Sequence, residues 1–467
     1  MRKIKFITAA FLLIVFSMNM AASAASGRQW DLTLPSLKDS FAEYFGIGNI
    51  IEPPQVAMEA MTDMFKHHYN FVTAENAMKP SNMSREQGVY RFTETDFLVN
   101  WAIENDIQVV GHALVWHSQS AGWLTIAEDG GPVTRAEARA NMEDYINAVA
   151  GHFAGRIYSW DVVNEAFITS ITSAPLEMEE GWWKGRLRKQ LSDTENRPSW
   201  YAAYANGADE EAGEDGSDYI YDAFIFARAA DPNAILYYND FNETDAGKRE
   251  AIAQMVEELN EKWESDPQNT EPGRLLIEGI GMQAHYWTAN LSPVSVELTI
   301  LRFAETGAVV SISELDIPIG SWNNYGEATK ENLERQAELY GELFEIFIKH
   351  SDKIERVTFW GKMDSQSWRS RGNPLLFDVA LSAKPAFFSV IETAPEAVLP
   401  PEAAQPSESS GEEAEEPTPP PTATESAAPD FTESDTENSD FLLIIIASAG
   451  GVLLIIIGAV LIIKKRK

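Results

Sequence analysis

Carboxylate and amide side chains recur where short apolar runs of this 467-residue chain end. One run ends in Asn164 and Glu165, and a later run ends in Glu314 and Asp316. Cleavage of a glycosidic bond needs two carboxylates, one as an acid and one as a nucleophile or base, and Glu165 and Glu314 form the natural pair. Amide, carboxylate and lysine groups would hold sugar hydroxyls, while tryptophan rings would support the apolar faces of the sugar. We therefore expect chemistry on a carbohydrate.

Similar clusters follow five other apolar runs. Their members are Glu75, Asn76 and Lys79; His112, Trp116 and Gln119; Asn239; Gln283 and His285; and Trp360 and Trp368. In a parallel barrel the catalytic groups lie at the C-terminal ends of the strands, which all meet at one face. Seven strand ends with such residues therefore predict a single site at that face. His117 lies beside this set, but a structural role would explain it equally well, and we leave it out of the predicted site.

Other kinds of chemistry are excluded by what the sequence lacks. There is no cysteine, which removes disulfides, thiolate metal sites and cysteine nucleophiles. The Gly-x-Ser-x-Gly turn of many serine hydrolases is absent. The seven histidines show no metal-binding spacing, so neither a metal nor a cofactor is expected. A net charge of −35 disfavours nucleic acid as a partner.

The elements that must position these residues alternate between strand and helix. Strands are predicted at 45–51, 70–73, 108–114, 157–163, 234–238, 276–283, 309–313 and 356–360. Amphipathic stretches between them predict helices, including those at 135–153, 219–229, 247–263 and 330–348. This α/β pattern favours a (β/α)8 TIM barrel over residues 27–393, with a long insertion after strand 4. A doubly wound open sheet is the alternative, but no Gly-rich phosphate loop follows the first strand.

Both ends of the chain differ in composition from this middle part. Residues 1–25 combine a basic start, an apolar run and small residues, which predicts a secretory signal peptide rather than an uncleaved anchor. Residues 394–440 form an acidic linker rich in Pro, Glu, Ser and Thr, which is expected to be a disordered stalk. Residues 441–463 carry no charge and predict one transmembrane helix, followed by a basic cytoplasmic tail at 464–467. We therefore expect a single-pass cell-membrane protein with an extracellular catalytic domain.

The motifs at the strand ends resemble those of glycoside hydrolase family 10, the retaining endo-β-1,4-xylanases. The resemblance is carried by residues 70–79, 111–119, 160–165, 239–242, 313–316 and 359–368, and it extends from about residue 37 to about residue 388. It implies a (β/α)8 barrel and double displacement through a covalent glycosyl-enzyme intermediate. Its implied substrates are xylan and xylo-oligosaccharides, and it leaves the oligomeric state open.

The resemblance also implies roles for individual residues. Glu165 would be the acid/base and Glu314 the nucleophile, and Asn164 would bind the 2-hydroxyl of the sugar at the cleavage point. His285 and Asp316 would orient the nucleophile and tune its charge. The other residues would bind substrate: Glu75, Asn76, Lys79, His112, Trp116 and Gln119 on the non-reducing side, Trp360 and Trp368 as platforms, and Asn239 and Gln283.

Two features depart from the family pattern. Phe241 stands where the family usually has tyrosine, and residues 168–218 form a long segment that could add sugar contacts or be a disordered flap. A related activity on β-glucan or mannan is an alternative, although Glu75, Asn76 and Lys79 together favour xylan. A catalytically silent carbohydrate-binding protein is a second alternative, and the presence of both glutamates argues against it.

Overall fold

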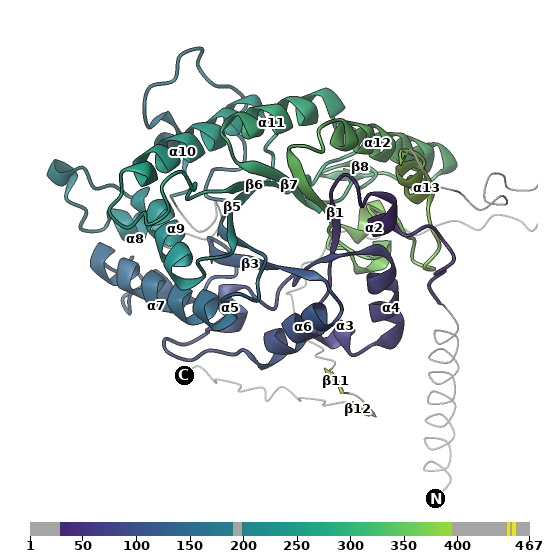
Figure 1. Cartoon of the computed structure of the whole chain (residues 1–467), viewed down its shortest axis with the longest axis horizontal. Helices are drawn as coiled ribbons and strands as arrows, with labels where there is room; N and C mark the ends of the chain where they lie inside the picture. Colours follow the sequence, from purple (N-terminus) through teal and green to yellow (C-terminus); the bar gives the residue numbers. More distant parts are fainter. Residues whose placement is uncertain (1–28, 190–198, 395–445, 449–450, 454–467) are drawn as a thin grey trace, which may run out of the picture. The chain divides into compact units, whose positions relative to one another are not determined.

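The structure is a computed structural model that describes residues 29–189, 199–394, 446–448 and 451–453. The chain divides into two units, Met1–Ala404 and Gln405–Lys467, which are described separately. Eight parallel strands of the first unit close into a barrel in the order β1-β10-β7-β6-β5-β4-β3-β2. Figure 1 looks into this barrel, with the helices arranged around the ring of strands. The predicted (β/α)8 fold is confirmed.

The barrel strands lie close to their predicted positions. They are β1 (Gly46–Ile50), β2 (Phe71–Thr73), β3 (Gln108–Trp116), β4 (Ser159–Asn164), β5 (Ile235–Asp240), β6 (Gly279–Met282), β7 (Val309–Leu315) and β10 (Ile354–Phe359). Close packing requires glycine at some positions. A Cβ on Gly111 of β3, for example, would lie 2.1 Å from Cε3 of Trp160 on β4.

Strand β6 starts three residues later than the sequence predicts. Leu276 and Ile277 are fully buried, as their apolar character indicates, but they lie outside the strand. Their main-chain groups bond instead to the side chain of Asn260, whose Oδ1 accepts from both N–H groups at 3.1 and 2.8 Å. The Asn260 amide also donates to the carbonyl oxygen of Ile277 at 3.0 Å. The apolar run therefore correctly indicates that Leu276 and Ile277 are buried. The side chain of Asn260, and not a neighbouring strand, binds their main-chain groups.

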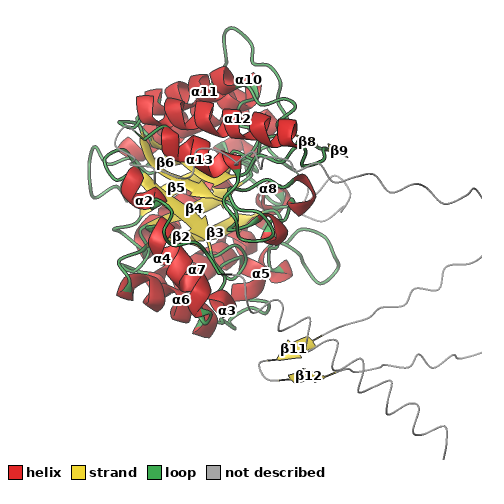
Figure 2. Ribbon diagram, turned by 90° about the vertical axis from the view of Figure 1, so that its right-hand side faces the viewer, coloured by secondary structure: helices red, strands yellow, loops and turns green. Residues whose placement is uncertain are grey.

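The helices cover the outside of the barrel, and Figure 2 shows them on both sides of the strands. The four predicted helices appear as α7 (Arg135–Phe153), α9 (Asp218–Ala230), α10 (Ala246–Glu264) and α12 (Lys330–Lys349). Further helices are α2 (Leu37–Ser40), α3 (Pro53–Val56), α4 (Glu59–His68), α5 (Pro80–Met83), α6 (Thr93–Glu104), α8 (Trp200–Ala205), α11 (Pro293–Glu305) and α13 (Pro385–Glu392). Helix α7 starts where its sequence dictates, because Thr134 and Glu137 form a capping box.

The described part of the long insertion after β4 is folded against the barrel. Trp183 is buried, and its indole N–H donates to Glu258 Oε2 of α10 at 2.6 Å. Gln254 of the same helix accepts from the main-chain N–H of Trp183 at 3.2 Å. The later part forms α8, which begins at the capping residue Ser199. Residues 168–189 and 199–218 are therefore an ordered extension rather than a flap.

The predicted transmembrane helix at 441–463 is not found where the structure describes this segment. Ile446–Ser448 (β11) pairs antiparallel with Gly451–Leu453 (β12), so these six residues form strands. β-Branched Ile446 and Val452 favour extended backbone, and Gly451 is a poor helix former. No helix in the described ranges is long and apolar enough to cross a membrane. The predicted signal peptide, nearly all of the linker, the rest of 441–463 and the basic tail lie outside the described residues.

Candidate active site

The two predicted catalytic glutamates lie at the C-terminal ends of β4 and β7. Glu165 directly follows β4 and has a positive φ of 56°, which turns the chain sharply as the strand ends. Glu314 is the penultimate residue of β7, and the residue is only 5 % exposed. A positive φ strains the backbone of a non-glycine residue, and such strained residues are common at functional sites. The barrel thus places both carboxylates at one mouth.

Glu314 is held by a chain of charged groups. His285 Nε2 lies 3.2 Å from Glu314 Oε2, and His285 Nδ1 lies 2.9 Å from Asp316 Oδ1. Burial would lower the pKa of His285, but the charge and hydrogen bond of Asp316 and the contact with Glu314 raise this pKa to about 9. Burial likewise opposes ionisation of Glu314, yet the His285 hydrogen bond and the charges of His112 and His285 bring the pKa of this carboxyl below its usual value. At neutral pH, a protonated His285 therefore faces an ionised Glu314.

Three amide side chains connect the two glutamates. Gln283 Nε2 donates to Glu165 Oε1 at 3.0 Å and to Asn164 Oδ1 at 3.1 Å. Asn239 Nδ2 donates to Asn164 Oδ1 at 3.0 Å and to Glu314 Oε1 at 2.8 Å. Glu165 and Glu314 therefore share one hydrogen-bond network, which fixes their mutual orientation.

The Asn164 amide fits this network in either of two orientations. With its oxygen toward Gln283 and Asn239, it accepts two hydrogen bonds, and its nitrogen lies 3.4 Å from Glu165 Oε1. Turned over, its oxygen accepts from Trp116 Nε1 at 3.2 Å and its nitrogen donates to the Asn239 carbonyl oxygen at 3.2 Å. The first orientation leaves one donor–donor contact, between Asn164 Nδ2 and Trp116 Nε1, whereas the turned amide would point its N–H groups at the N–H groups of both Gln283 and Asn239, so the first orientation is the better one.

A second polar cluster brings together the predicted residues from β2 and β3. Lys79 Nζ donates to Gln119 Oε1 at 2.9 Å and to Asn76 Oδ1 at 3.2 Å, and it lies 4.8 Å from the centre of the Trp116 ring. Burial lowers the pKa of Lys79, although several carboxylates, Glu314 and Glu75 among them, oppose this shift. Burial raises the pKa of Glu75 against the charge of Lys79. These groups offer both donors and acceptors to sugar hydroxyls.

The rings of His112, Trp360 and Trp368 lie beside residues of these two clusters. Buried His112 bonds through Nδ1 to Asp161 Oδ2 at 2.8 Å, and its ring meets the buried Trp360 edge-on at 5.5 Å. Trp368 is 53 % exposed, meets the His285 ring at 5.1 Å and donates from Nε1 to Asp316 Oδ2 at 3.1 Å. An exposed indole fixed at its N–H is suited to support a sugar ring.

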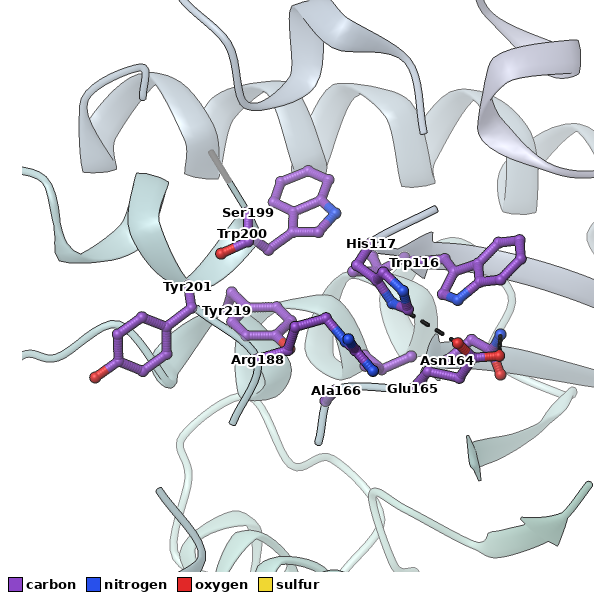
Figure 3. A pocket seen from close by; sticks show the side chains of 12 residues that line it. Trp116, His117, Asn164, Glu165, Ala166, Arg188, Ser199, Trp200, Tyr201 and Tyr219 are labelled. Carbon is purple, nitrogen blue, oxygen red and sulfur yellow. Dashed lines mark hydrogen bonds and ion pairs between the residues drawn. The ribbon is translucent and has the colours of Figure 1, made fainter. Parts of the chain in front are cut away.

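A small pocket adjoins Glu165 on the side of the insertion. Figure 3 shows His117, Arg188, Trp200 and Tyr201 around it. His117 Nδ1 lies 3.8 Å from Glu165 Oε2. Burial and the charge of Arg188 lower the pKa of His117 to about 3, so its ring is neutral. The insertion therefore reaches Glu165.

Sequence reasoning missed several residues of this mouth. Asp161 binds His112, and Arg369 donates from Nη1 to Asp316 Oδ1 at 2.5 Å. Glu52 Oε1 accepts from the main-chain N–H of Asn76 at 2.6 Å. Lys362 donates to the carbonyl oxygen of Ile50 at 2.8 Å, and burial lowers its pKa to about 8 against the charges of Glu75 and Glu52. Asp161 could have been found from the sequence, because a charged residue inside an apolar strand indicates a buried polar partner.

A (β/α)8 barrel whose mouth holds two amide-bound carboxylates, among further amides and an exposed indole, is the fold and site of a glycoside hydrolase. No group of three or more histidine, aspartate or glutamate side chains in the described ranges could hold a metal ion.

Comparison with known proteins agrees with this class. Residues 36–393 match Glycosyl hydrolase family 10. A Beta-1,4-xylanase of Dictyoglomus thermophilum is 34 % identical over 82 % of this chain and 96 % of its own length. Endo-1,4-beta-xylanase A of Thermotoga neapolitana is 36 % identical over 81 % of this chain. The matched part is only 32 % of the length of that enzyme. The crystal structure of a GH10 xylanase from termite gut that contains a bacterial Ig-like domain has a TM-score of 0.66 and 36 % identity, over 78 % of this chain and 79 % of that one.

The chain belongs to glycosyl hydrolase family 10. It is a retaining glycoside hydrolase that cleaves internal β-1,4 bonds of xylan by double displacement.

Proposed function

We propose that Glu314 and Glu165 divide the double displacement of this xylanase between them. Glu314 attacks the anomeric carbon, and the bond to the leaving oxygen breaks as Glu165 transfers its proton to that oxygen. Glu165 then removes a proton from water, which attacks the same carbon and releases Glu314. The observation that carries this assignment is the protonated His285 at 3.2 Å from Glu314, because it keeps the nucleophile ionised.

The network of amides supports the same division of labour. Asn239 and Gln283 hold the two carboxylates through Asn164, whose role is to bind the sugar 2-hydroxyl in the transition state. The Lys79 cluster and Trp368 hold xylose units on the non-reducing side.

The experiment that tests this function compares substrates and products. Reducing ends should appear from linear xylan, and carboxymethyl-cellulose should be a poor substrate. Proton NMR of early products should show the β-anomer first, as retention requires. An initial α-anomer would contradict the double displacement, and preferential cleavage of the cellulose derivative would contradict the substrate.

We also propose that the enzyme is exported and held at the cell membrane, with the barrel outside. This proposal rests on the sequence: a basic and apolar N-terminal segment, an uncharged segment at 441–463 and four basic residues after it. Inside a bilayer, such a segment would have to be helical to satisfy its main-chain groups. Protease added to intact cells should release active barrel and leave the C-terminal tail with the membrane fraction. Activity confined to the cytosol would contradict the proposal.

A further inference from the structure

The main chain that follows Glu165 is held by hydrogen bonds from two sides. Glu165 has a positive φ of 56°, so the direction of its side chain depends on a strained turn. Figure 3 shows Ala166 beside Glu165. The N–H of Ala166 donates to Tyr238 Oη at 3.1 Å, and its carbonyl oxygen accepts from the N–H of Arg188 at 2.8 Å. A side-chain hydroxyl of β5 therefore helps to fix the turn that carries Glu165.

The Tyr238 hydroxyl is oriented by a buried ion pair. It donates to Asp240 Oδ2 at 2.5 Å, and Asp240 Oδ1 lies 2.7 Å from Lys248 Nζ of α10. All three side chains are fully buried. Burial raises the pKa of Asp240, while the charge of Lys248 and the hydrogen bonds from Lys248 and Tyr238 oppose this shift. Because Asp240 takes the hydroxyl proton, the lone pairs of the phenol oxygen face the Ala166 N–H.

Lys248 belongs to a rigidly packed helix start. Its main-chain N–H donates to the carbonyl oxygen of Ile171, in the insertion after β4, at 2.9 Å. A Cβ on the preceding Gly247 would lie 2.4 Å from the carbonyl oxygen of Ser173, so the two segments are in close contact. The Lys248 ammonium also lies 4.2 Å from the centre of the Phe241 ring, a cation–π distance. The ion pair is therefore anchored at both of its ends.

Strand β5 serves the two catalytic glutamates through its two faces. Asn239 binds Glu314 Oε1 inside the barrel at 2.8 Å. Tyr238 and Asp240 flank Asn239 in the sequence, and neighbouring side chains of a strand point to opposite faces. The fully buried Tyr238 hydroxyl cannot touch a bound sugar, so any effect it has on catalysis must pass through the main chain it binds.

We propose that Tyr238 is a positioning residue that acts on catalysis through Glu165. Its hydroxyl, oriented by Asp240 and Lys248, fixes the turn that aims the Glu165 carboxyl group at the leaving oxygen. Without the hydroxyl, the Ala166 N–H loses its partner and protonation of the leaving group is slower, while attack by the nucleophile is unchanged. This inference rests on the proposed function, because it requires Glu165 to be the acid.

The test uses Tyr238→Phe in the full chain, which removes the hydroxyl and keeps the ring. Its kcat/KM should fall about tenfold on xylo-oligosaccharides and on phenyl β-xylobioside, whose leaving groups need a proton. On a dinitrophenyl β-xylobioside, which needs none, kcat/KM should be unchanged. Tyr237→Phe is the matched control. Tyr237 is the adjacent, equally buried tyrosine, and its hydroxyl binds Glu355 of β10, so this variant should keep wild-type values on both xylobioside substrates.

A double-mutant cycle separates positioning from a merely structural role. In a Glu165→Ala background, Tyr238→Phe should cause no further loss on phenyl β-xylobioside, because the group it positions is absent. The same fold-loss with and without the Glu165 carboxyl would overturn the proposal. An equal loss on both xylobiosides, or wild-type kinetics of Tyr238→Phe, would also overturn it.

A second variant removes the support of the hydroxyl. Asp240→Leu combined with Lys248→Met leaves no unpaired charge in the core, and it should show the same dependence on the leaving group. It is judged by the same criteria if Tyr238→Phe proves unstable. If Glu165→Ala alone kept full activity on phenyl β-xylobioside, the proposed role of Glu165 would fail, which is a different result from an unchanged Tyr238→Phe variant.

Discussion

The imidazole of His285 lies 3.2 Å from the carboxylate of Glu314, and the two groups hold opposite charges at neutral pH. Asp316 stabilises the imidazolium from the other side, at 2.9 Å. Both ring nitrogens therefore act as donors, as only the protonated form allows. The pKa of about 9 links the charge of His285, and so the surroundings of Glu314, to the pH of the solution.

The first prediction concerns His285→Gln. Loss of a charge-assisted hydrogen bond costs about 1.5–3 kcal/mol, so kcat at pH 7 should fall by roughly 10- to 100-fold. On an aryl xylobioside that needs no protonation, wild-type kcat/KM should decline as the pH rises through about 9, where His285 loses its proton. The variant should lack this decline. A wild-type profile that stays flat to pH 10 would show that the charge of His285 does not matter.

The same proton contributes to stability. The pKa of His285 is raised above its ordinary value, so its contribution is complete below about pH 6.5 and is lost as the pH rises through about 9. Denaturant titrations should therefore show a decrease in the free energy of unfolding over this range, and the decrease should be smaller in His285→Gln. Identical pH dependence of the two proteins would contradict the assigned charge.

The second prediction separates the two glutamates. Glu314→Ala should leave almost no turnover, even on aryl xylobiosides with good leaving groups. Glu165→Ala should keep fast glycosylation of those substrates, which need no proton, and azide should restore turnover by replacing the activated water. Stopped-flow measurement of aryl alcohol release, with and without azide, distinguishes the two variants. If both behaved alike, the assignment of nucleophile and acid would be wrong.

The third prediction concerns the space beside Asn239. A Cβ on Gly281 would lie 2.2 Å from Asn239 Oδ1, which also accepts from Ser313 Oγ at 2.6 Å. Gly281→Ala should therefore displace the Asn239 amide from Glu314 and lower kcat by at least about 10-fold. Gly151→Ala, in the exposed part of α7 with open space around it, is the control and should slightly raise the melting temperature. Full activity of Gly281→Ala would show that the amide is not needed.

Much of this site follows from local sequence, because strand periodicity changes to polar residues where each barrel strand ends. Glu165, Glu314 and His285 are predictable in this way, whereas their partners depend on which strands pair and in what register. Asp161 lies beside His112 because β3 and β4 pair at these two residues, and local pattern does not contain that pairing.

Contacts made by loops are harder to predict. Arg369 reaches Asp316 from the segment after β10, which is far from β7 in the sequence. Trp183 could have been an exposed sugar platform, but Glu258 of α10 binds its indole N–H and the side chain is buried. In each case a tertiary partner decides the role of the residue, and the residue type alone leaves several roles open.

The last prediction concerns Glu243, a fully buried acid in the loop after β5. Its Oε1 accepts from Tyr286 Oη at 2.7 Å, and its Oε2 has no hydrogen-bond partner among the described residues. Burial raises its pKa to about 7, although the Tyr286 hydrogen bond and the charges of Lys248 and His285 oppose the shift. An acid whose pKa is raised in the folded state destabilises the fold as the pH rises.

This destabilisation should begin near pH 4.5, the ordinary pKa of the side chain, and become complete above about 7. At 1.36 kcal/mol per pKa unit, its full size is about 3 kcal/mol. Glu243→Gln keeps the acceptor for Tyr286 and removes the ionisation. It should therefore match wild type at pH 5 and exceed it by up to about 3 kcal/mol at pH 8 in denaturant titrations. Glu305→Gln, on the exposed side of α11, is the control and should show no such growth with pH. A Glu243→Gln variant whose advantage did not increase between pH 5 and pH 8 would show that Glu243 ionises normally.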